Sequence, residues 1–302
     1  MTADDAATVA AIVVNHNAGR HLVDCLVSLR EAGVGQRIVV DNASSDGSRR
    51  PARVEDPAAT WIDSGANLGY GRAANLGATS TAAPFLLVCN PDLRVRPDAV
   101  RCLVRRLDAE PDLGAVGPLI RNPDGTVYPS ARTFPDLVDA IGHGALGLVA
   151  PGNRFTRRYR RLDADYSVPG RADWVSGACV LLRRQAWDAV GGFDPSFFMY
   201  LEDVDLCWRL HRAGWGVGFE PSAEVVHVQG VSAGRHPYRM LVAHHRSLWR
   251  FAWRTTDGAR RLALPLVGAG LVLRLVAASA QHRLGGPGGR PAAGPDGGGR
   301  LP

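Results

Sequence analysis

The sequence predicts an α/β protein built on a parallel, doubly wound sheet. Short apolar runs alternate with segments of helical spacing through the first hundred residues, and most of these runs end in polar residues. The 302 residues, of which 46% are hydrophobic, are enough to bury a sizeable core. Strands that alternate with helices favour a parallel sheet whose loops gather at one edge.

The first part of the chain supplies the alternating elements. Continuous apolar runs indicate buried strands, and apolar residues three or four positions apart indicate helices. In chain order we expect a strand at 9–14, a helix at 20–32, short strands at 37–40 and 60–62, a helix at 69–79, a strand at 85–89 and a helix at 97–109. In open α/β sheets ligands bind at the carboxyl ends of strands. Asp92, in the Asn-Pro-Asp turn after 85–89, therefore stands where chemistry is usual, although Asn-Pro-Asp is also ordinary turn material.

The pattern changes after residue 113, where Gly, Pro and Asn become frequent. We expect a strand at 178–182, a helix at 202–213 and at least one strand within 216–228. Residues 135–171 carry few periodic signals, and we expect them to be mobile.

The C-terminal quarter has a composition of its own. The chain contains no lysine, and residues 231–302 hold 11 arginines against only Asp257 and Asp296, whereas residues 1–230 are mildly acidic. Aromatic and aliphatic residues interleave with the arginines at 237–254, a pattern that suits anionic lipid or nucleic acid. The apolar stretch 262–280 contains Arg274 and is marginal for a membrane span, so an interfacial helix or hairpin fits better. The Gly/Pro-rich segment 285–302 is expected to be disordered.

The cysteines and the N-terminus indicate a cytoplasmic protein, which we expect to be peripheral to the inner face of the cell membrane. The cysteine count is odd, contains no CxxC pair and falls in apolar segments: Cys25, Cys89, Cys102, Cys179 and Cys207. We interpret these residues as small buried hydrophobes in a reducing compartment rather than zinc ligands. The acidic start lacks the positive region of a signal peptide.

Four polar groups follow predicted strands or lie in the loops after them, at 15–17, 41–46, 67–71 and 90–92. Four such groups at one edge define a cleft. A sugar nucleotide needs an acceptor for the N–H of its base, close backbone approach to its ribose and a carboxylate that carries a divalent cation. Mg²⁺ is usually held by one or two carboxylates together with phosphate oxygens, and Asp92 with Asn90 meets that description.

Blocks of sequence in a fixed order resemble family 2 inverting glycosyltransferases, most closely the bacterial rhamnosyltransferase-like branch. The blocks are Val-Val-Asn-His-Asn (13–17), Val-Val-Asp-Asn-Ala-Ser-Ser-Asp-Gly-Ser (39–48), Ala-Asn-Leu-Gly-Tyr-Gly-Arg-Ala-Ala-Asn (66–75), Leu-Val-Cys-Asn-Pro-Asp (87–92), Asp-Trp-Val-Ser-Gly-Ala-Cys-Val-Leu-Leu-Arg-Arg (173–184), Gly-Gly-Phe-Asp-Pro-Ser-Phe-Phe (191–198), Tyr-Leu-Glu-Asp-Val-Asp-Leu-Cys-Trp-Arg (200–209) and His-Val-Gln-Gly-Val-Ser (227–232). The resemblance implies a GT-A fold, in which a Rossmann-like nucleotide-binding half joins an acceptor half.

Carried over residue by residue, the resemblance implies a nucleotide-sugar site in which Asp41 binds the base and the 67–71 loop lines the ribose. The residues of that site are Asn15, Asn17, Asp41, Asn67, Gly69, Tyr70 and Asn90. Asn90-Pro91-Asp92 stands where the family has its DXD-type motif, with Asn90 in place of the first aspartate. Asp92 and His227 are the implied ligands of a divalent metal, Mg²⁺ or Mn²⁺. An ordinary histidine at a strand end is the alternative for His227.

The acidic pair Glu202-Asp203 matches the position of the catalytic base, and we favour Asp203 over Glu202. Inversion by direct displacement needs a carboxylate to deprotonate the acceptor hydroxyl, and a helix N-terminus favours the ionised form. An acidic first helical turn without catalytic duty is the alternative. Asp205, four residues before Arg209, is expected to form a helix-surface pair. The implied acceptor-binding residues are Asp173, Trp174, Ser176 and Gly177, with a plain core position as the alternative for Trp174.

These expectations give a GT-A catalytic domain at 1–230, divided into a nucleotide-binding half (1–112) and an acceptor half (113–230). A helical, basic and apolar extension at 231–284 and the tail at 285–302 follow. The expected activity is metal-dependent transfer of a sugar from a nucleotide-diphosphate donor to a lipid-linked glycan at the cytoplasmic face of the membrane. By resemblance alone the best specific pairing is dTDP-L-rhamnose with N-acetylglucosaminyl-diphospho-polyprenol. The alternatives are a UDP-sugar donor with another acceptor, a nucleic-acid-binding protein and a non-catalytic scaffold.

Overall fold

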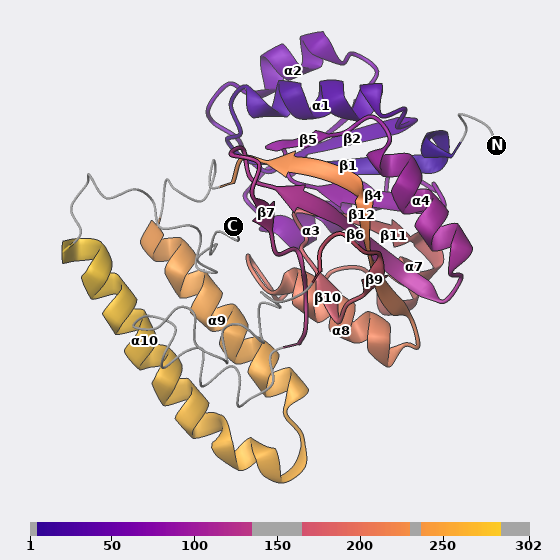
Figure 1. Cartoon of the computed structure of the whole chain (residues 1–302). Helices are drawn as coiled ribbons and strands as arrows, with labels where there is room; N and C mark the ends of the chain where they lie inside the picture. The colour runs from indigo at the N-terminus through magenta and orange to yellow at the C-terminus, as the bar shows by residue number, and fades with distance from the viewer. Residues whose placement is uncertain (1–4, 135–164, 230–236, 285–302) are drawn as a thin grey trace.

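The computed structural model describes residues 5–134, 165–229 and 237–284, and its centre is a large mixed sheet (Figure 1). The sheet has the strand order β3-β2-β1-β4-β11-β6-β12-β5, with β7 paired to β6 and β9 paired to β12. Its strands are β1 (Val9–Asn15), β2 (Gln36–Asp41), β3 (Thr60–Asp63), β4 (Phe85–Cys89), β5 (Leu93–Val95), β6 (Leu113–Arg121), β7 (Val127–Tyr128), β9 (Gly170–Arg171), β11 (Cys179–Arg183) and β12 (Gly216–His227). A separate two-stranded sheet pairs β8 (Ala131–Arg132) with β10 (Trp174–Val175).

The prediction of a parallel sheet is correct for the first four strands and for the neighbouring pair β6 and β12, which is also parallel. β1 pairs in parallel with β2 and β4, and β2 pairs in parallel with β3. Beyond β4 the sheet is mixed, because β11 runs antiparallel to both β4 and β6, and β5 runs antiparallel to β12. A continuous apolar run indicates that a strand is buried but carries no information about its direction, so the sequence pattern could not distinguish these pairings.

Strand β6 was not expected, because Gly114, Gly117 and Pro118 interrupt its apolar pattern. The structure shows why small residues stand there. A Cβ atom on Gly117 would lie 2.7 Å from Cβ of Val175, and one on Gly114 would lie 2.8 Å from Cβ of Ala186. The strand therefore passes too close to its neighbours to carry side chains at these two positions.

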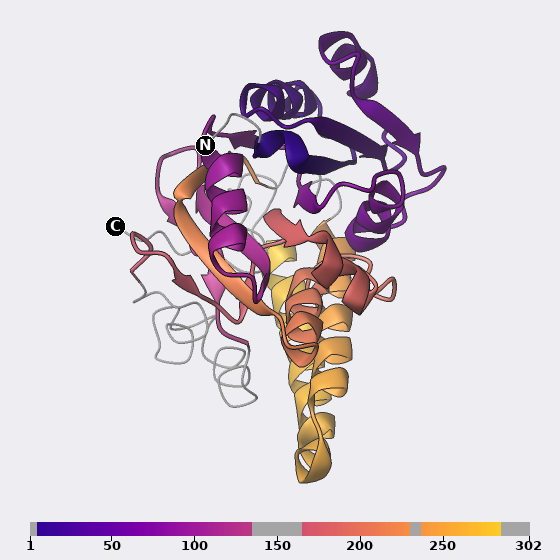
Figure 2. The same cartoon turned by 90° about the vertical axis from the view of Figure 1, so that its right-hand side faces the viewer.

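Helices cover both faces of the sheet (Figures 1 and 2). The helices are α1 (His21–Glu31), α2 (Arg49–Glu55), α3 (Tyr70–Ala78), α4 (Ala99–Ala109), α7 (Arg184–Val190), α8 (Glu202–Arg212), α9 (Pro237–Thr255) and α10 (Leu264–Leu284), with short 3₁₀ turns at Ala6–Thr8 and Gly258–Ala263. One face of the sheet packs against α1, α2 and α4, and the other packs against α3, α7 and α8. Helices α2 and α7 were not predicted from the sequence.

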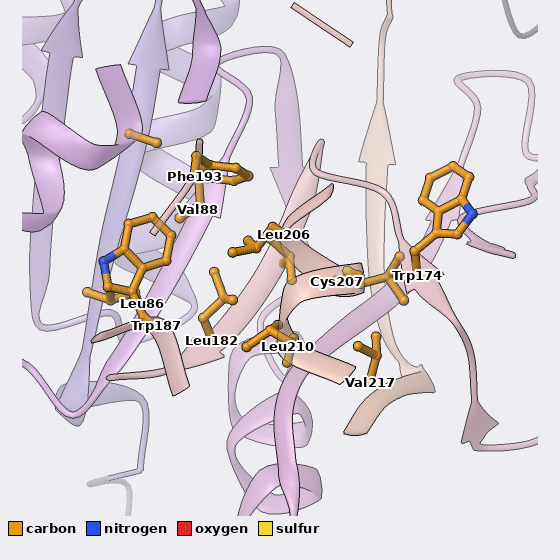
Figure 3. Packing of buried hydrophobic residues seen from close by; sticks show 14 of the residues in the cluster. Leu86, Val88, Trp174, Leu182, Trp187, Phe193, Leu206, Cys207, Leu210 and Val217 are labelled. Carbon is orange, nitrogen blue, oxygen red and sulfur yellow. The ribbon is translucent and has the colours of Figure 1, made fainter. Parts of the chain in front are cut away.

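The core beneath α8 joins the two ends of the sheet. Leu206 and Leu210 of α8 point toward Leu182 of β11, while Cys207 lies near Val217 of β12 (Figure 3). The rings of Trp187 and Phe193 meet edge to face at a centroid distance of 5.4 Å on the same side of the sheet. Helix α8, which begins with the predicted catalytic pair, is thereby fixed against the strands that carry the rest of the site.

Helices α9 and α10 form an antiparallel pair that projects from the rest of the fold (Figures 1 and 2). The expected C-terminal helices are therefore present. Across residues 5–134, 165–229 and 237–284, no helix combines the length and the apolar character needed to cross a membrane. The expectations for the 285–302 tail and for most of the 135–171 segment fall outside the described residues.

Candidate functional site

The predicted strand-end groups do meet at one edge of the sheet. Parallel pairing places Asn15, the last residue of β1, opposite Asp41, the last residue of β2. β4 lies on the other side of β1, and the turn with Asp92 follows it. His227 ends β12 and pairs with Leu93 of β5, which begins directly after Asp92.

Asp41, at the end of β2, is held by polar contacts from several neighbouring residues. Its Oδ1 accepts a hydrogen bond from Nδ2 of Asn15 at 2.8 Å, and its Oδ2 accepts one from the backbone N–H of Ser44 at 3.2 Å. Arg49 Nη1 lies 3.4 Å from the same Oδ2. Asn15 is fully buried and supports Asp41, whose own side chain is only 1% exposed. Asn17 fixes the adjoining loop, because its Oδ1 accepts the backbone N–H of Ser45 at 2.8 Å.

Asn42 connects the β2 end to the loop predicted to line a ribose, a role that the sequence interpretation did not assign. Its Oδ1 accepts the backbone N–H of Leu68 at 2.8 Å, and its Nδ2 donates to Oδ1 of Asn67 at 3.1 Å. Its position directly after Asp41 was the available signal. Asn67 remains exposed at the rim, where a ligand can reach it.

Gly69 and Tyr70 join this loop to the second half of the chain. The backbone N–H of Tyr70 donates to the carbonyl of Phe198 at 3.1 Å, and the phenol donates to the carbonyl of Gly177 at 2.6 Å. Gly69 has a φ of 85°, and a Cβ atom there would lie 2.2 Å from the Phe198 carbonyl oxygen. Burial raises the pKa of Tyr70 well above its usual value. Tyr70 is therefore a fixed, neutral bridge, with 8% of its surface exposed.

Asp92 and His227 form a pair at the centre of the edge. Nε2 of His227 lies 3.1 Å from Oδ1 of Asp92 and 3.2 Å from Nδ2 of Asn90. Burial opposes ionisation of Asp92, but the charge of His227 and its hydrogen bond hold the pKa of Asp92 below its usual value. A carboxylate oxygen and an imidazole nitrogen that face each other suit a divalent cation.

The residues present are only part of a metal shell. Among the residues that the structure describes, no three or more His, Cys, Asp or Glu side chains gather as a metal-binding group. A cation held by Asp92 and His227 would therefore draw further ligands from the phosphate oxygens of a nucleotide, as Mg²⁺ commonly does. Rotation of the Asn90 amide would turn its oxygen toward the same point. The donor set fits a cation that arrives with a nucleotide diphosphate.

The predicted base lies across a short turn from this pair. Oδ2 of Asp203 accepts the backbone N–H of Gly177 at 2.8 Å, while the carbonyl of Ala178 accepts the backbone N–H of Asn90 at 2.9 Å. The turn at 176–178 therefore borders both the Asp92 group and the Asp203 carboxylate. A Cβ atom on Gly177 would lie 2.9 Å from Cβ of Asp203, so glycine permits this approach.

Glu202 and Asp203 differ in environment although they are adjacent. Glu202 is buried, and its Oε2 has no hydrogen-bond partner among the residues that the structure describes. Burial, followed by repulsion from Asp203, raises the pKa of Glu202 to about 8. Asp203 is half-buried and anchored by the Gly177 amide. At neutral pH Glu202 carries its proton, which leaves Asp203 as the available carboxylate.

The predicted acceptor residues lie beside the same turn but are not equally accessible. Oδ2 of Asp173 accepts the backbone N–H of Phe134 at 2.7 Å, and Ser176 donates its backbone N–H to the Ser130 carbonyl at 2.8 Å. Trp174 is 5% exposed, and its indole N–H donates to the Thr133 carbonyl at 2.9 Å. These contacts favour the core alternative for Trp174, whereas Asp173 is only half-buried.

The expectation of a surface pair at Asp205 is wrong. Its Oδ2 does accept Nε of Arg209 at 2.7 Å, but the Asp205 side chain is 0% exposed. Its other oxygen pairs with Arg254 of α9. Spacing of i to i+4 predicts that two side chains are neighbours but not which face of the helix is buried.

The chain is similar in sequence to known glycosyltransferases. Residues 10–191 match the sequence model described as Glycosyl transferase family 2. The chain is 41% identical over 258 residues to the N-acetylglucosaminyl-diphospho-decaprenol L-rhamnosyltransferase of Mycobacterium tuberculosis, covering 80% of this chain and 82% of that relative. It is 29% identical over 144 residues to the rhamnosyltransferase WbbL of Escherichia coli, covering 47% and 52% of the two chains.

Among solved structures, the fold is similar to the mannosyltransferase PcManGT from Pyrobaculum calidifontis, determined in complex with GDP-Man and Mn²⁺. The TM-score is 0.58 at 18% sequence identity, and the match covers 90% of this chain and 75% of that one.

Proposed function

Because the chain belongs to glycosyl transferase family 2, we propose that it transfers L-rhamnose from dTDP-L-rhamnose, with inversion, to a lipid-linked N-acetylglucosaminyl-diphosphate acceptor. The family membership and the GT-A fold expected from the sequence are confirmed. The rhamnosyl donor and the acceptor are inferred from the relative that is 41% identical over most of both chains.

One structural observation carries the proposal. The turn at 176–178 receives the Asn90 amide on one side and offers the Gly177 amide to Asp203 on the other. A carboxylate placed to accept a proton thus stands next to the group that suits a cation and a diphosphate. An inverting transferase needs these two functions on either side of the reacting sugar.

The donor would bind along the strand ends. Asp41 would accept the N–H of the base, and the loop held by Asn42 would contact the ribose through Asn67. Asp92 and His227 would hold a divalent cation, which neutralises charge on the leaving diphosphate when bound. The solved mannosyltransferase was obtained with Mn²⁺, which supports a divalent metal for this fold.

Asp203 would act as the general base. It takes the proton of the acceptor hydroxyl as the oxygen attacks the anomeric carbon and the bond from that carbon to the diphosphate oxygen breaks on the opposite face. The Gly177 N–H orients its carboxylate, and its place in the first turn of α8 favours the ionised form. The neutral Glu202 beside it adds no second negative charge at pH 7.

The C-terminal helices would bring the enzyme to its lipid-linked acceptor. Leu266, Leu273 and Val276 of α10 are 75%, 70% and 63% exposed and recur at helical spacing, so α10 presents apolar side chains outward. Trp253 is 55% exposed, and Arg261 lies 5.9 Å from its ring centroid. Exposed tryptophan and arginine beside an apolar face are typical of helices that lie in the surface of a bilayer.

Donor hydrolysis over a panel of dTDP-, UDP- and GDP-sugars, with Mg²⁺ or Mn²⁺ and with a chelator, tests the proposal. We expect metal-dependent turnover with dTDP-L-rhamnose and transfer when the diphospholipid acceptor is added. Turnover of a UDP-sugar alone would keep the chemistry and correct the donor. Absence of turnover and of nucleotide binding in every case would refute the enzyme assignment.

A further inference from the structure

Arg254, near the end of α9, binds two carboxylates from different parts of the catalytic fold. Its Nη1 lies 2.5 Å from Oδ1 of Asp205, in the first turn of α8, and its Nη2 pairs with Oδ2 of Asp194 in the loop before that helix. Arg209 donates to the second oxygen of Asp205 at 2.7 Å. The guanidinium therefore ties a C-terminal helix to the segment that leads into the predicted base.

Burial of Asp205 makes its contact with Arg254 a strong one. The Asp205 side chain is 0% exposed, whereas that of Arg254 is 33% exposed. A buried carboxylate is costly unless it is paired and hydrogen-bonded, and without Arg254 only Arg209 would balance the charge of Asp205. A planar guanidinium can serve two carboxylates at once, which a lysine ammonium cannot match in geometry. Arg254 is thus suited to holding α8 and the loop that contains Asp194 in one fixed arrangement.

The geometry of α8 connects the contact between Arg254 and Asp205 to Asp203. Two residues along an α-helix correspond to a rotation of about 200°, so Asp203 and Asp205 point to opposite sides of the first turn. Asp203 faces the Gly177 amide, and Asp205 faces α9. The first turn of α8 is therefore held between the 176–178 turn and Arg254.

The entry into α8 is strained, and α9 contacts it directly. Tyr200 and Leu201 are consecutive non-glycine residues with left-handed φ values of 66° and 61°. Such conformations persist only where surrounding structure holds them. The Ser247 hydroxyl donates to the Met199 carbonyl at 3.0 Å, and the ring of His244 meets that of Tyr200 edge to face at 5.4 Å. Both contacts come from α9.

We propose that α9 is part of the catalytic apparatus, with Arg254 as a positioning residue that sets the place of Asp203 through Asp205 and Asp194. The inference rests on the role proposed above for Asp203. It gives the C-terminal helices a duty besides membrane contact. It also places a determinant of the active site more than 60 residues beyond the stretch that matches the family model.

The test compares Arg254→Ala with Arg246→Ala in the full-length protein. Arg246 is an exposed arginine on the same helix, so both variants lose one positive charge from α9. A misplacement of a catalytic group by about 1 Å can lower a rate roughly 100-fold. We expect a fall in kcat of that order for Arg254→Ala, an unchanged KM for the sugar nucleotide, and wild-type kinetics for Arg246→Ala. Arg254→Lys, which retains the charge, should recover part of the loss.

Hydrogen exchange separates this inference from the proposed function. In Arg254→Ala the amides of 200–206 should exchange faster than in the wild type, whereas those of β1 and β4 should be unchanged. Wild-type kcat, or unchanged exchange at 200–206, would overturn the positioning role. If Arg254→Ala does not fold, Arg254→Lys and Asp194→Asn carry the same comparison. An inactive wild type with faster exchange in the variant would refute only the proposed function.

Discussion

Nε2 of His227 lies 3.1 Å from Oδ1 of Asp92 although 135 residues separate them in the chain. Asp92 follows β4, and His227 ends β12, two strands that are not neighbours in the sheet. The short strand β5 begins right after Asp92 and pairs with the end of β12, which brings the two side chains together. The pair is thus a product of the mixed half of the sheet rather than of the Rossmann-like half alone.

Asp92→Asn should abolish the metal-dependent part of nucleotide binding. The substitution removes the charge that would attract a divalent cation but keeps the shape of the side chain. Wild-type protein should be stabilised by dTDP more strongly with Mg²⁺ or Mn²⁺ than without. The stabilisation reaches about 2.7 kcal/mol at a ligand concentration of 100 times Kd. A thermal-shift titration with and without metal measures the difference.

The control for that experiment is Asp98→Asn, which removes an exposed carboxylate close by in the sequence. It should behave as the wild type. A metal-dependent shift that survives in Asp92→Asn would remove Asp92 from the metal site.

Asp203→Asn should abolish transfer while leaving nucleotide binding nearly intact. An asparagine side-chain oxygen can still accept the Gly177 N–H, so the turn at 176–178 should hold its shape. General-base catalysis contributes roughly 10²- to 10⁴-fold to a rate, and the loss in kcat should fall in that range. Transfer assays and nucleotide calorimetry on the same preparation check both halves of the statement. Loss of binding together with activity would mean that the base is another residue.

The sequence located the candidate site residues more readily than the contacts that support them. Asp41 and Asp92 come at or just after the ends of apolar runs, and Asp203 lies at the start of a predicted helix, so sequence patterns mark all three. Asp205 was misjudged because its burial depends on α9, a helix that arrives about 30 residues later in the chain. Periodicity within one helix cannot show which partner helix covers a given face.

The same limit applies to the residues expected to touch ligands. Asn15 and Tyr70 occupy motif positions, yet Asn15 supports Asp41 and Tyr70 bridges to Gly177. Sequence blocks locate the residues around a site, but only packing decides which of them a ligand can contact.

Glu202→Gln should increase the stability of the protein relative to the wild type, and the increase should grow as pH rises. The pKa of Glu202 is about 8 in the folded protein against 4.5 for an unperturbed glutamate. Between these values the folded state keeps a proton that the unfolded chain has lost, so the free energy of unfolding decreases as pH rises. The slope from one such group is about 1.4 kcal/mol per pH unit.

Glutamine does not titrate, so the stability of Glu202→Gln relative to wild type should grow from about pH 4.5 to pH 8 and then level off. Urea unfolding at several pH values measures this. The variant should keep transfer activity at pH 7, since Glu202 is already neutral there. A constant difference across that pH range would show that Glu202 is ionised in the folded protein.

Replacement of exposed apolar residues on α10 should release the protein from membranes without unfolding it. Leu266 and Leu273 are 75% and 70% exposed, so Leu266→Ser combined with Leu273→Ser removes little packing within the fold. Each buried leucine side chain contributes about 1.5–3 kcal/mol when it leaves water, so the double variant should bind anionic vesicles far more weakly. Co-sedimentation with phosphatidylglycerol vesicles measures the change. Val54→Ser, at a valine of α2 that is 78% exposed, is the matched control and should bind as the wild type.

If the double variant sediments like the wild type at both low and high salt, α10 does not contact lipid. If it binds only at low salt, the arginines of the C-terminal helices still attract the surface while the apolar insertion is lost, because salt screens charge attraction but not burial of apolar side chains.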